Sequence, residues 1–488
     1  MYAADDVPLS ADEPAADRDL PIDAPAQSDA FVRGISQLIG GPSGRHTAKR
    51  FGSYWAVVQI VIAIACFTLM MNWVEKSDCA SGEWVKLSQY RHACYTDVVA
   101  LYGSEGLADG QVPYRDHPVE YPVLTGALMG LVGLPIHAIS QHHPDINPYE
   151  WFYNANALVL GALALASVGV LLALRRRRPW DAAMFAASPA LFVAATVNWD
   201  LLSVAFAMFA MHAWARRRPG LAGVLAGLGA AAKLWPLLLL VPIIMLSWRA
   251  RRLREAAYAL AMAVVAWAAV NVPVAIAWPH SWWEFFHLNT TREVDWGTIW
   301  YIGAHVPVPG GHGIQPFIWL SDPAHVNVVN TLQGVLFCIA LVGIGLLVAL
   351  APRRPRVAAI AFLVVAAFLI FSKVWSQQYV LWLIPLAVLA RPRWGAFLAW
   401  QLAEVGYFLA FDGELMGASG NPIFPEGVFV LGAALRLVTL LILCGYVIRD
   451  VLRPEHDVVR RDYADDPDGG VLEGAPDRWE IPTVPQLA

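Results

Sequence analysis

The chain has 488 residues, of which 57% are hydrophobic and only 15% are charged, and its formal net charge is -5. A soluble protein of this length needs more charge to cover its surface, so the composition predicts an integral membrane protein. Nucleic-acid binding is excluded, because the arginines come in short clusters between apolar runs and form no basic face.

Both ends of the chain differ in composition from its middle. Residues 1–50 are rich in Ala, Asp and Pro and poor in large apolar residues, which predicts a disordered tail. The first apolar run starts at Tyr54, too far from Met1 for a cleavable signal peptide. Basic residues precede this run, so we expect a cytoplasmic N-terminus. Residues 449–488 are again polar and acidic and predict a second cytoplasmic tail.

Between the tails, residues 51–448 predict one polytopic, all-α membrane domain with about twelve spanning helices. Several apolar segments are shorter than the roughly 20 residues that a full helical span requires. Short segments at membrane depth are typical of broken or re-entrant helices that line a cavity. After the first run, the expected segments are 122–139, 152–174, 182–197, 199–215, 219–232, 234–247, 254–277, 329–350, 356–372, 376–391, 394–411 and 427–448.

Arginine clusters between these segments predict the orientation. Lys and Arg favour the cytoplasmic side of a membrane, so Arg175–Arg178, Arg216–Arg218, Arg249–Arg254, Arg353–Arg356 and Arg391–Arg393 should share that side. Every second connection then lies outside, including the long loops 75–121 and 278–328. A full crossing by 122–139 would place the first cluster outside, so we expect that this segment, or another short one, does not cross.

Under this orientation the unusual polar residues gather on the external side. Ionisable groups at membrane depth are costly and usually line functional cavities. Simpler explanations remain open: Asn198 and Asp200 as helix caps, Lys233 and Lys373 as side chains that reach for water, and ion pairs within a solvated loop. The residues concerned are Asp97, Tyr102, Tyr114, Arg115, Asp116, Glu120, Tyr121, Asn198, Asp200, Lys233, Lys373, Gln377, Gln378 and Tyr379.

Four further features of the sequence lead to predictions. Glu404 and Arg436 lie mid-way along neighbouring segments, which favours a buried ion pair, with Arg436 on a lipid phosphate as the alternative. Segment 278–328 is dense in aromatic residues, which indicates an amphipathic surface helix that could also hold a sugar acceptor. Cys79 and Cys94 share one loop and can form a disulfide in an oxidising compartment. The histidines lack metal-ligand spacing, so no metal site is expected.

In these motifs the chain resembles the polyprenyl-phosphate-mannose-dependent mannosyltransferases of glycosyltransferase family 87, within the GT-C class. The likeness covers roughly residues 51–448. It rests on the order of five short motifs: Asp97 with Tyr102, Pro113-Tyr114 through Glu120-Tyr121-Pro122, Asn198-Trp199-Asp200, Lys233-Leu234-Trp235-Pro236, and Lys373 through Tyr379. One departure is the single proline after Tyr121, where the mannosyltransferases often have two.

The resemblance implies a GT-C-like bundle in the plasma membrane with its active site on the external side. Asp97 matches the catalytic base of that class, although Asp116 and Glu120 in the same loop are alternatives. Lys233 and Lys373 could stabilise the leaving polyprenyl phosphate, with Arg436 as a further candidate. The other polar residues named above would bind substrate, while Cys79, Cys94 and Glu404 would be structural.

The predicted reaction is transfer of a sugar, expected to be mannose, from a polyprenyl-phosphate donor to a cell-envelope glycolipid or glycan, with inversion. The donor is a substrate, so no cofactor is expected, and oligomeric state stays open. Two alternatives are a lipid-linked oligosaccharide polymerase or ligase, and a secondary transporter. A polymerase should show several arginines in its large external loop, and a transporter should favour sites near the bilayer midplane.

Overall fold

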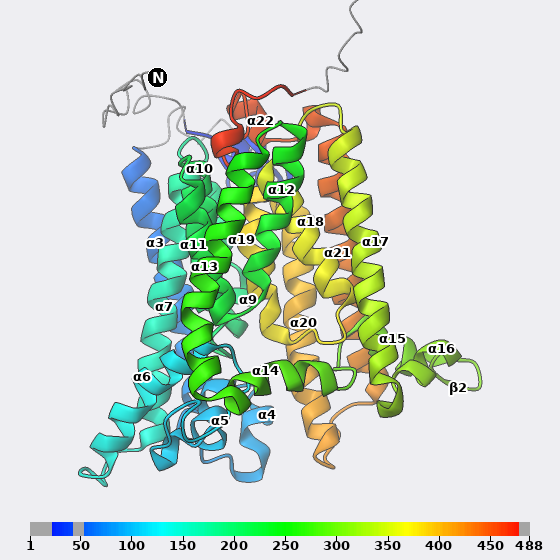
Figure 1. The fold of residues 1–488 in the computed structure, drawn as a ribbon. Helices are drawn as coiled ribbons and strands as arrows, with labels where there is room; N and C mark the ends of the chain where they lie inside the picture. Colours follow the sequence, from blue (N-terminus) through cyan, green and yellow to red (C-terminus); the bar gives the residue numbers. More distant parts are fainter. Residues whose placement is uncertain (1–21, 42–52, 478–488) are drawn as a thin grey trace, which may run out of the picture.

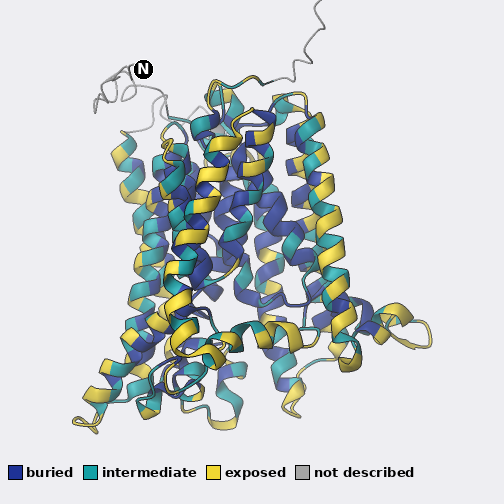
Figure 2. Cartoon of the chain, in the orientation of Figure 1, coloured by how far each residue is buried: buried dark blue, intermediate teal, exposed yellow. Residues whose placement is uncertain are grey.

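The computed structural model describes residues 22–41 and 53–477, and the rest of both predicted tails lies outside the described residues. Long helices run side by side through one bundle, and the connections gather at its two ends (Figure 1). Buried residues face the interior along these helices, while exposed residues follow the outer helices (Figure 2). One small sheet is present in the described part: β1 (Pro307–Val308) pairs antiparallel with β2 (Gly311–His312).

Within the described residues, six helices are long and apolar enough to cross a membrane. They are α3 (Tyr54–Ser77), α6 (Val123–Ser140), α7 (Pro148–Leu174), α13 (Leu253–Ala277), α17 (Val326–Leu350, preceded by the short turn Pro323–His325) and α21 (Glu426–Leu452). Shorter apolar helices are α10 (Asp200–Ala215), α11 (Pro219–Ala232), α12 (Leu240–Arg249, after the turn Trp235–Leu239), α18 (Val357–Phe371) and α19 (Val380–Ala390, after the turn Gln377–Tyr379). The protein is therefore an all-α, multi-pass membrane protein.

The remaining helices complete the bundle and its edges. The expected segment 182–197 is broken at Ser188 into α8 (Ala182–Ala186) and α9 (Pro189–Ala194). Helix α20 (Trp394–Ala418) is long but carries buried Glu404 and Asp412. At one end of the bundle lie α4 (Ser88–Arg91), α5 (Asp97–Ser104), α14 (Pro279–Thr291), α15 (Ile299–His305) and α16 (Gln315–Leu320), and α14 lies across the bundle (Figure 1).

All five arginine clusters lie at the other end, which we call the terminal end. There they meet a folded segment, residues 453–477, which we call the C-terminal cap and which contains α22 (Val459–Asp462). The contacts are Arg175 to Asp468 at 2.7 Å, Arg217 to Glu473 at 2.6 Å, Arg249 to the Asp477 carbonyl at 2.8 Å, Arg353 to Asp477 at 2.6 Å, and Arg393 to the His456 carbonyl at 2.9 Å. The expectation that the clusters share one side of the bundle is confirmed.

Helix α6 explains how the first arginine cluster comes to lie on the same side as the other four. It starts beside the end of α11, where Thr125 donates to the Ala232 carbonyl at 2.7 Å. It ends beside the loop after α5, where His137 Nδ1 lies 2.8 Å from the Ala108 carbonyl oxygen. Both ends of α6 thus lie at the end opposite the terminal end, which we call the site end. Helix α7 then runs to Arg175 at the terminal end, so 122–139 does not cross, although it is long and apolar enough to do so.

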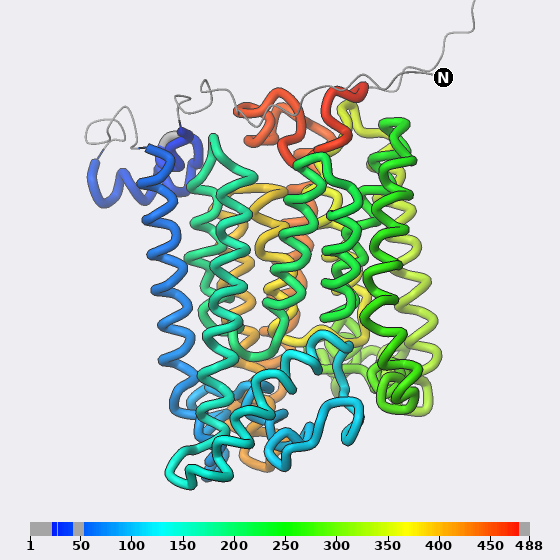
Figure 3. The backbone as a smooth tube through the Cα atoms, turned by 60° about the vertical axis from the view of Figure 1, so that its left-hand side comes forward, coloured from blue at the N-terminus to red at the C-terminus, as the bar shows by residue number. Residues whose placement is uncertain are grey.

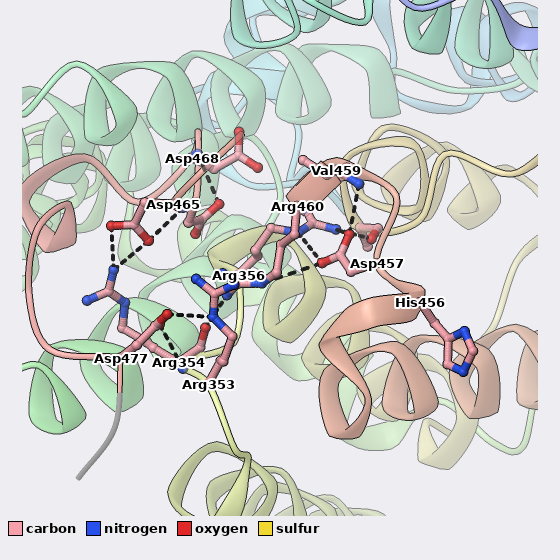
Figure 4. A network of polar contacts seen from close by, with 12 residues as sticks. Arg353, Arg354, Arg356, His456, Asp457, Val459, Arg460, Asp465, Asp468 and Asp477 are labelled. Atoms are coloured by element: carbon pink, nitrogen blue, oxygen red, sulfur yellow. Dashed lines mark hydrogen bonds and ion pairs between the residues drawn. The ribbon is translucent and has the colours of Figure 1, made fainter. Parts of the chain in front are cut away.

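The described parts of both predicted tails are folded, which corrects the expectation of disorder for the N-terminal tail. The cap carboxylates neutralise buried arginines: Arg356 pairs with Asp457 at 2.7 Å and Arg354 with Asp465 at 2.9 Å (Figure 4). Near the N-terminus, α1 (Pro25–Ser28) and α2 (Ala30–Gly40) lie at the same end as the cap (Figure 3). The Asp29 carboxylate between them accepts a hydrogen bond from the Trp394 amide at 3.0 Å. Composition predicted polarity here, but not these long-range ion pairs.

Close packing of α11 on α13 requires two glycines. A Cβ at Gly223 or Gly227 would collide with the carbonyl groups of Ala259 and Ala263. Small residues four apart let helix backbones approach closely in a membrane. This contact matters for the site end, because Lys233 directly follows α11.

The substitution Gly227→Leu should destabilise the protein by about 1–3 kcal/mol or more, because the side chain must push two backbones apart. Thermal unfolding in detergent, followed by circular dichroism, measures this loss. Gly343→Leu is the matched control, since a Cβ at Gly343 on α17 meets open space. Equal melting temperatures for the two variants would contradict the close helix contact.

Candidate active site

A cavity of about 740 Å³ opens at the site end of the bundle. Its walls come from the loop before α5, segment 120–122, Asn198 before α10, Lys233 after α11, the end of α14 with the residues up to Asp295, the turn before α19, and one side of α20. All five sequence motifs contribute at least one residue to these walls. The connections predicted to share one side therefore converge on one cavity.

Asp97 is the first residue of α5, which Thr96 caps through its side-chain oxygen. The Asp97 amide donates to the Val197 carbonyl at 2.8 Å, so the loop before α5 is joined to the residues just before Asn198. Asn198 Nδ2 donates to Asp97 Oδ2 at 2.7 Å, and Gln378 lies 3.5 Å from the same oxygen. Burial raises the pKa of Asp97, while hydrogen bonds from Asn198 and Tyr95 and the charge of Lys233 oppose this rise. The Asp97 carboxylate is therefore fixed in position, faces the cavity and is more basic than an ordinary aspartate.

Asn198 is a bridge and not a helix cap. Its Nδ2 also donates to the Tyr121 hydroxyl at 2.5 Å, so three motifs meet at one amide. Helix α10 has no side-chain cap from its preceding residue, Trp199, and Asp200 is used elsewhere. The capping explanation for these residues is therefore wrong.

Lys233 is held inside the wall of the cavity by Asp200. The Lys233 Nζ lies 2.9 Å from Asp200 Oδ2, and the Asp200 side chain is fully buried. Trp382 Nε1 donates to the other oxygen of Asp200 at 2.5 Å. The ammonium also lies 4.9 Å from the centre of the Tyr379 ring. The explanation that Lys233 only reaches for water is therefore excluded. Its fixed positive charge lies beside Asp97.

Lys373 does not line the main cavity. Its Nζ donates to the Thr290 carbonyl at 3.2 Å and to the Arg292 carbonyl at 2.5 Å, which secures the end of α14. It lines a second cavity of about 300 Å³ that adjoins the first and shares Lys233 with it. Burial and the nearby Arg292 lower the pKa of Lys373 to about 8. Lys373 therefore carries a positive charge that weakens at mildly alkaline pH.

Arg436 is bound within the protein. Its Nε lies 2.9 Å from Glu404 Oε2, and both side chains are buried. Its other nitrogens donate to the Trp375 and Ser376 carbonyls at 2.9 and 3.1 Å. The expected ion pair between α20 and α21 is present. Because Arg436 does not line either cavity, its assignment to a donor phosphate is corrected: it supports the turn that carries Gln377 and Gln378.

Five residues assigned to substrate lie outside the cavity, and one of them is Asp200, the buried partner of Lys233. Tyr102 is buried against Tyr149 and Phe152 on the inner face of α5. Tyr114 is also buried, and its hydroxyl donates to the Tyr121 carbonyl at 2.9 Å, so it positions Tyr121 and does not contact substrate. Arg115 and Asp116 form an exposed pair at 2.8 Å. Asp116 is thereby removed as an alternative base, whereas Glu120 lines the cavity and remains one.

The sequence did not single out several residues that form the cavity. Tyr95 hydrogen-bonds to Asp97 through its side chain. Arg292 lines the cavity and pairs with Asp295 at 3.2 Å. Its place at the end of an amphipathic helix was visible in the sequence, but the fold of α14 over the cavity was not. Among the described residues, no group of three or more His, Cys, Asp or Glu side chains could hold a metal ion.

Cys79 and Cys94 form a disulfide in the loop between α3 and α5. The bond joins the end of α3 to the residues that directly precede Asp97. The loop of the candidate base is therefore covalently tied to a membrane-spanning helix.

Comparison with known protein families identifies this arrangement. The family-wide sequence model of glycosyltransferase family 87 matches residues 122–375, slightly more than half of the chain. The chain belongs to glycosyltransferase family 87. The match covers Asn198, Asp200, Lys233 and Lys373 but not Asp97, whose role rests on the geometry above. No curated protein matches the chain. As a family 87 member with this fold, the protein is a membrane glycosyltransferase.

Proposed function

We propose that this family 87 glycosyltransferase moves a sugar, most simply mannose, from a polyprenyl-phosphate donor to an acceptor hydroxyl on the external side of the plasma membrane. The observation that carries the proposal is one cavity in which the Asp97 carboxylate lies near the buried Lys233–Asp200 pair. A base beside a fixed cation suits a reaction in which a hydroxyl attacks a carbon whose leaving group is an anion.

In the proposed reaction, Asp97 accepts the proton of the acceptor hydroxyl as its oxygen attacks the anomeric carbon. The bond to the donor phosphate breaks, and the electron pair leaves with the polyprenyl phosphate. Lys233 and Arg292 are the cations that line the cavity in the described part of the chain and would stabilise this phosphate. Direct displacement from the opposite face inverts the anomeric centre.

The adjoining cavity supports a lipid-linked donor. It is lined by Trp235, Phe337, Phe368 and Trp382 among its apolar residues, together with Lys233 and Lys373. An isoprenoid chain fits such an apolar wall, and the two lysines would lie near its phosphate. Lys373 would thus assist the donor from the adjoining cavity, not from the main one.

The charge of the main cavity bears on the acceptor. Asp97, Glu120, Glu293 and Asp295 line it, against Lys233 and Arg292, so carboxylates outnumber cations before the donor phosphate enters. The acceptor sugar that enters this cavity should therefore be uncharged, whether it belongs to a glycolipid or to a glycan. A second anion beside these carboxylates would be repelled.

The test uses the protein in lipid nanodiscs with radiolabelled polyprenyl-phosphate-mannose and neutral mannose-terminated acceptors. Transfer from this donor, but not from a polyprenyl-diphosphate-linked sugar, supports the proposal. Transfer only from the diphosphate donor would instead support a polymerase or ligase. Labelled polyprenyl-phosphate-glucose and -arabinose, run in parallel, identify the sugar.

The reaction should have two pH limits. Activity should rise with pH as Asp97 loses its proton, and this limb should lie above the range of an ordinary aspartate because burial raises its pKa. The apparent KM for the donor should increase above pH about 8, where Lys373 loses its charge. In Lys373→Met the apparent donor KM should be high at all pH values and should no longer increase at alkaline pH. An alkaline limb that persists in Lys373→Met would assign it to another group.

A further inference from the structure

Helix α3 carries a buried lysine where its packing pattern calls for an apolar residue. The buried stripe of α3 consists of Val57, Val61, Ala65, Thr68, Asn72 and Lys76, and the Lys76 side chain is 0% exposed. Burying an ammonium group costs several kcal/mol unless it is paired and hydrogen-bonded. A lysine at the end of this stripe therefore needs specific partners.

The partners of Lys76 come from three directions. Its Nζ lies 3.2 Å from Glu75 Oε2, and it lies 4.6 Å from the centre of the Phe408 ring on α20. It also donates to the Ala93 carbonyl at 3.0 Å. One turn after Phe408, the buried Asp412 carboxylate has no hydrogen-bond partner among the described residues. Lys76 is the cation whose charge acts on Asp412, so one ammonium serves the buried Asp412 and the partly exposed Glu75.

The contact with Ala93 joins Lys76 to the loop that precedes Asp97. Ala93 has a left-handed φ of 56°, a conformation that residues other than glycine rarely adopt. The next residue is Cys94, which is bonded to Cys79, and Asp97 follows three residues later. On its other side the loop is held by Thr96, whose hydroxyl donates to the Thr196 carbonyl at 2.6 Å. The loop is thus fixed between α3 and the segment that leads to Asn198.

We propose that Lys76 is a positioning residue: through its hydrogen bond to the Ala93 carbonyl it holds residues 93–96 in the conformation that aims Asp97 at the cavity. The proposal rests on the proposed function of Asp97 as the base. Lys76 touches neither cavity, so it acts on the reaction through the loop and not on substrate.

The test compares Lys76→Met with the double variant Lys76→Met/Asp412→Asn, in full-length protein in nanodiscs. The double variant removes the buried charge that the single variant leaves without a cation, so it is expected to fold. Both should lower kcat by about 10- to 100-fold with donor and acceptor KM within about twofold, because a misplaced base slows the chemistry but not binding. Lys76→Arg, which keeps the charge and a donor, should restore kcat. Asp412→Asn alone is the matched control and should keep wild-type kcat.

Amide hydrogen exchange supplies a readout that does not need activity. In both methionine variants the amides of residues 93–97 should exchange at least about tenfold faster than in wild type, while those of α17 stay unchanged. A folded double variant with wild-type kcat and wild-type exchange at 93–97 would overturn the proposal and leave Lys76 as a counter-charge for Asp412. Absence of transfer by the wild type would refute the proposed function, and the exchange data would still decide the role of Lys76.

Discussion

Asp97→Asn should lower kcat by about 100- to 10,000-fold, the range that a general base typically contributes. The amide has nearly the shape of the carboxylate and can stay within reach of Asn198 and Gln378, but it cannot accept a proton. The KM for the proposed lipid-linked donor should change little, because in the proposed reaction the leaving phosphate would meet Lys233 and Arg292 and not Asp97. Single-turnover transfer with radiolabelled donor measures the chemical step directly.

Glu120→Gln is the matched control for this experiment. Glu120 also lines the cavity, and burial and the nearby Asp97 raise its pKa, so it is the remaining alternative base. If Asp97 is the base, Glu120→Gln should retain most of the activity. A large loss of kcat in Glu120→Gln, together with near-normal transfer by a folded Asp97→Asn, would move the base to Glu120.

Lys233→Met should reduce both stability and activity. It leaves the fully buried Asp200 carboxylate without its cation, and removal of one partner of a buried pair typically costs about 3–5 kcal/mol. It also removes a fixed charge from the wall that the donor phosphate would meet. Thermal unfolding and the donor dependence of transfer measure the two effects separately.

The double variant Lys233→Met/Asp200→Asn separates these roles. It removes both charges, so most of the stability should return, whereas transfer should stay low if Lys233 stabilises the leaving phosphate. Arg217→Met is the surface control: its pair with Glu473 is largely exposed, and such pairs contribute about 0–1 kcal/mol. Recovery of both stability and transfer in the double variant would show that Lys233 serves only to neutralise Asp200.

Much of the fold was predictable because hydropathy and arginine placement are local signals. The expected segments match the helices closely, and the position of Arg175–Arg178 predicted that 122–139 or another short segment does not cross. The convergence of Asp97, Asn198 and Lys233 was also predictable, since all three lie in connections on the same side. Each of these conclusions needs only the order of segments and the rule that basic residues stay on one side.

The direction of individual side chains was not predictable. Lys373 and Lys233 both lie in connections at the site end. Lys373 donates to backbone carbonyls, whereas Lys233 pairs with Asp200. Tyr102 belongs to the same motif as Asp97 but lies on the inner face of α5. The acidic C-terminal segment has the composition of a solvated tail, and only its pairing with distant arginines shows otherwise. Contacts between residues hundreds of positions apart leave no trace in a single sequence.

The position of the C-terminal cap in the chain also bears on the order in which the bundle is assembled. Arg175 is synthesised almost three hundred residues before its partner, Asp468. While the helices are being inserted, the clusters are therefore still unpaired by the cap and can act as signals that keep their loops on one side. The cap carboxylates follow the helices of the bundle in the chain, so they can neutralise these charges only after those helices have been synthesised. Docking of residues 453–477 would then be the step that closes a finished bundle.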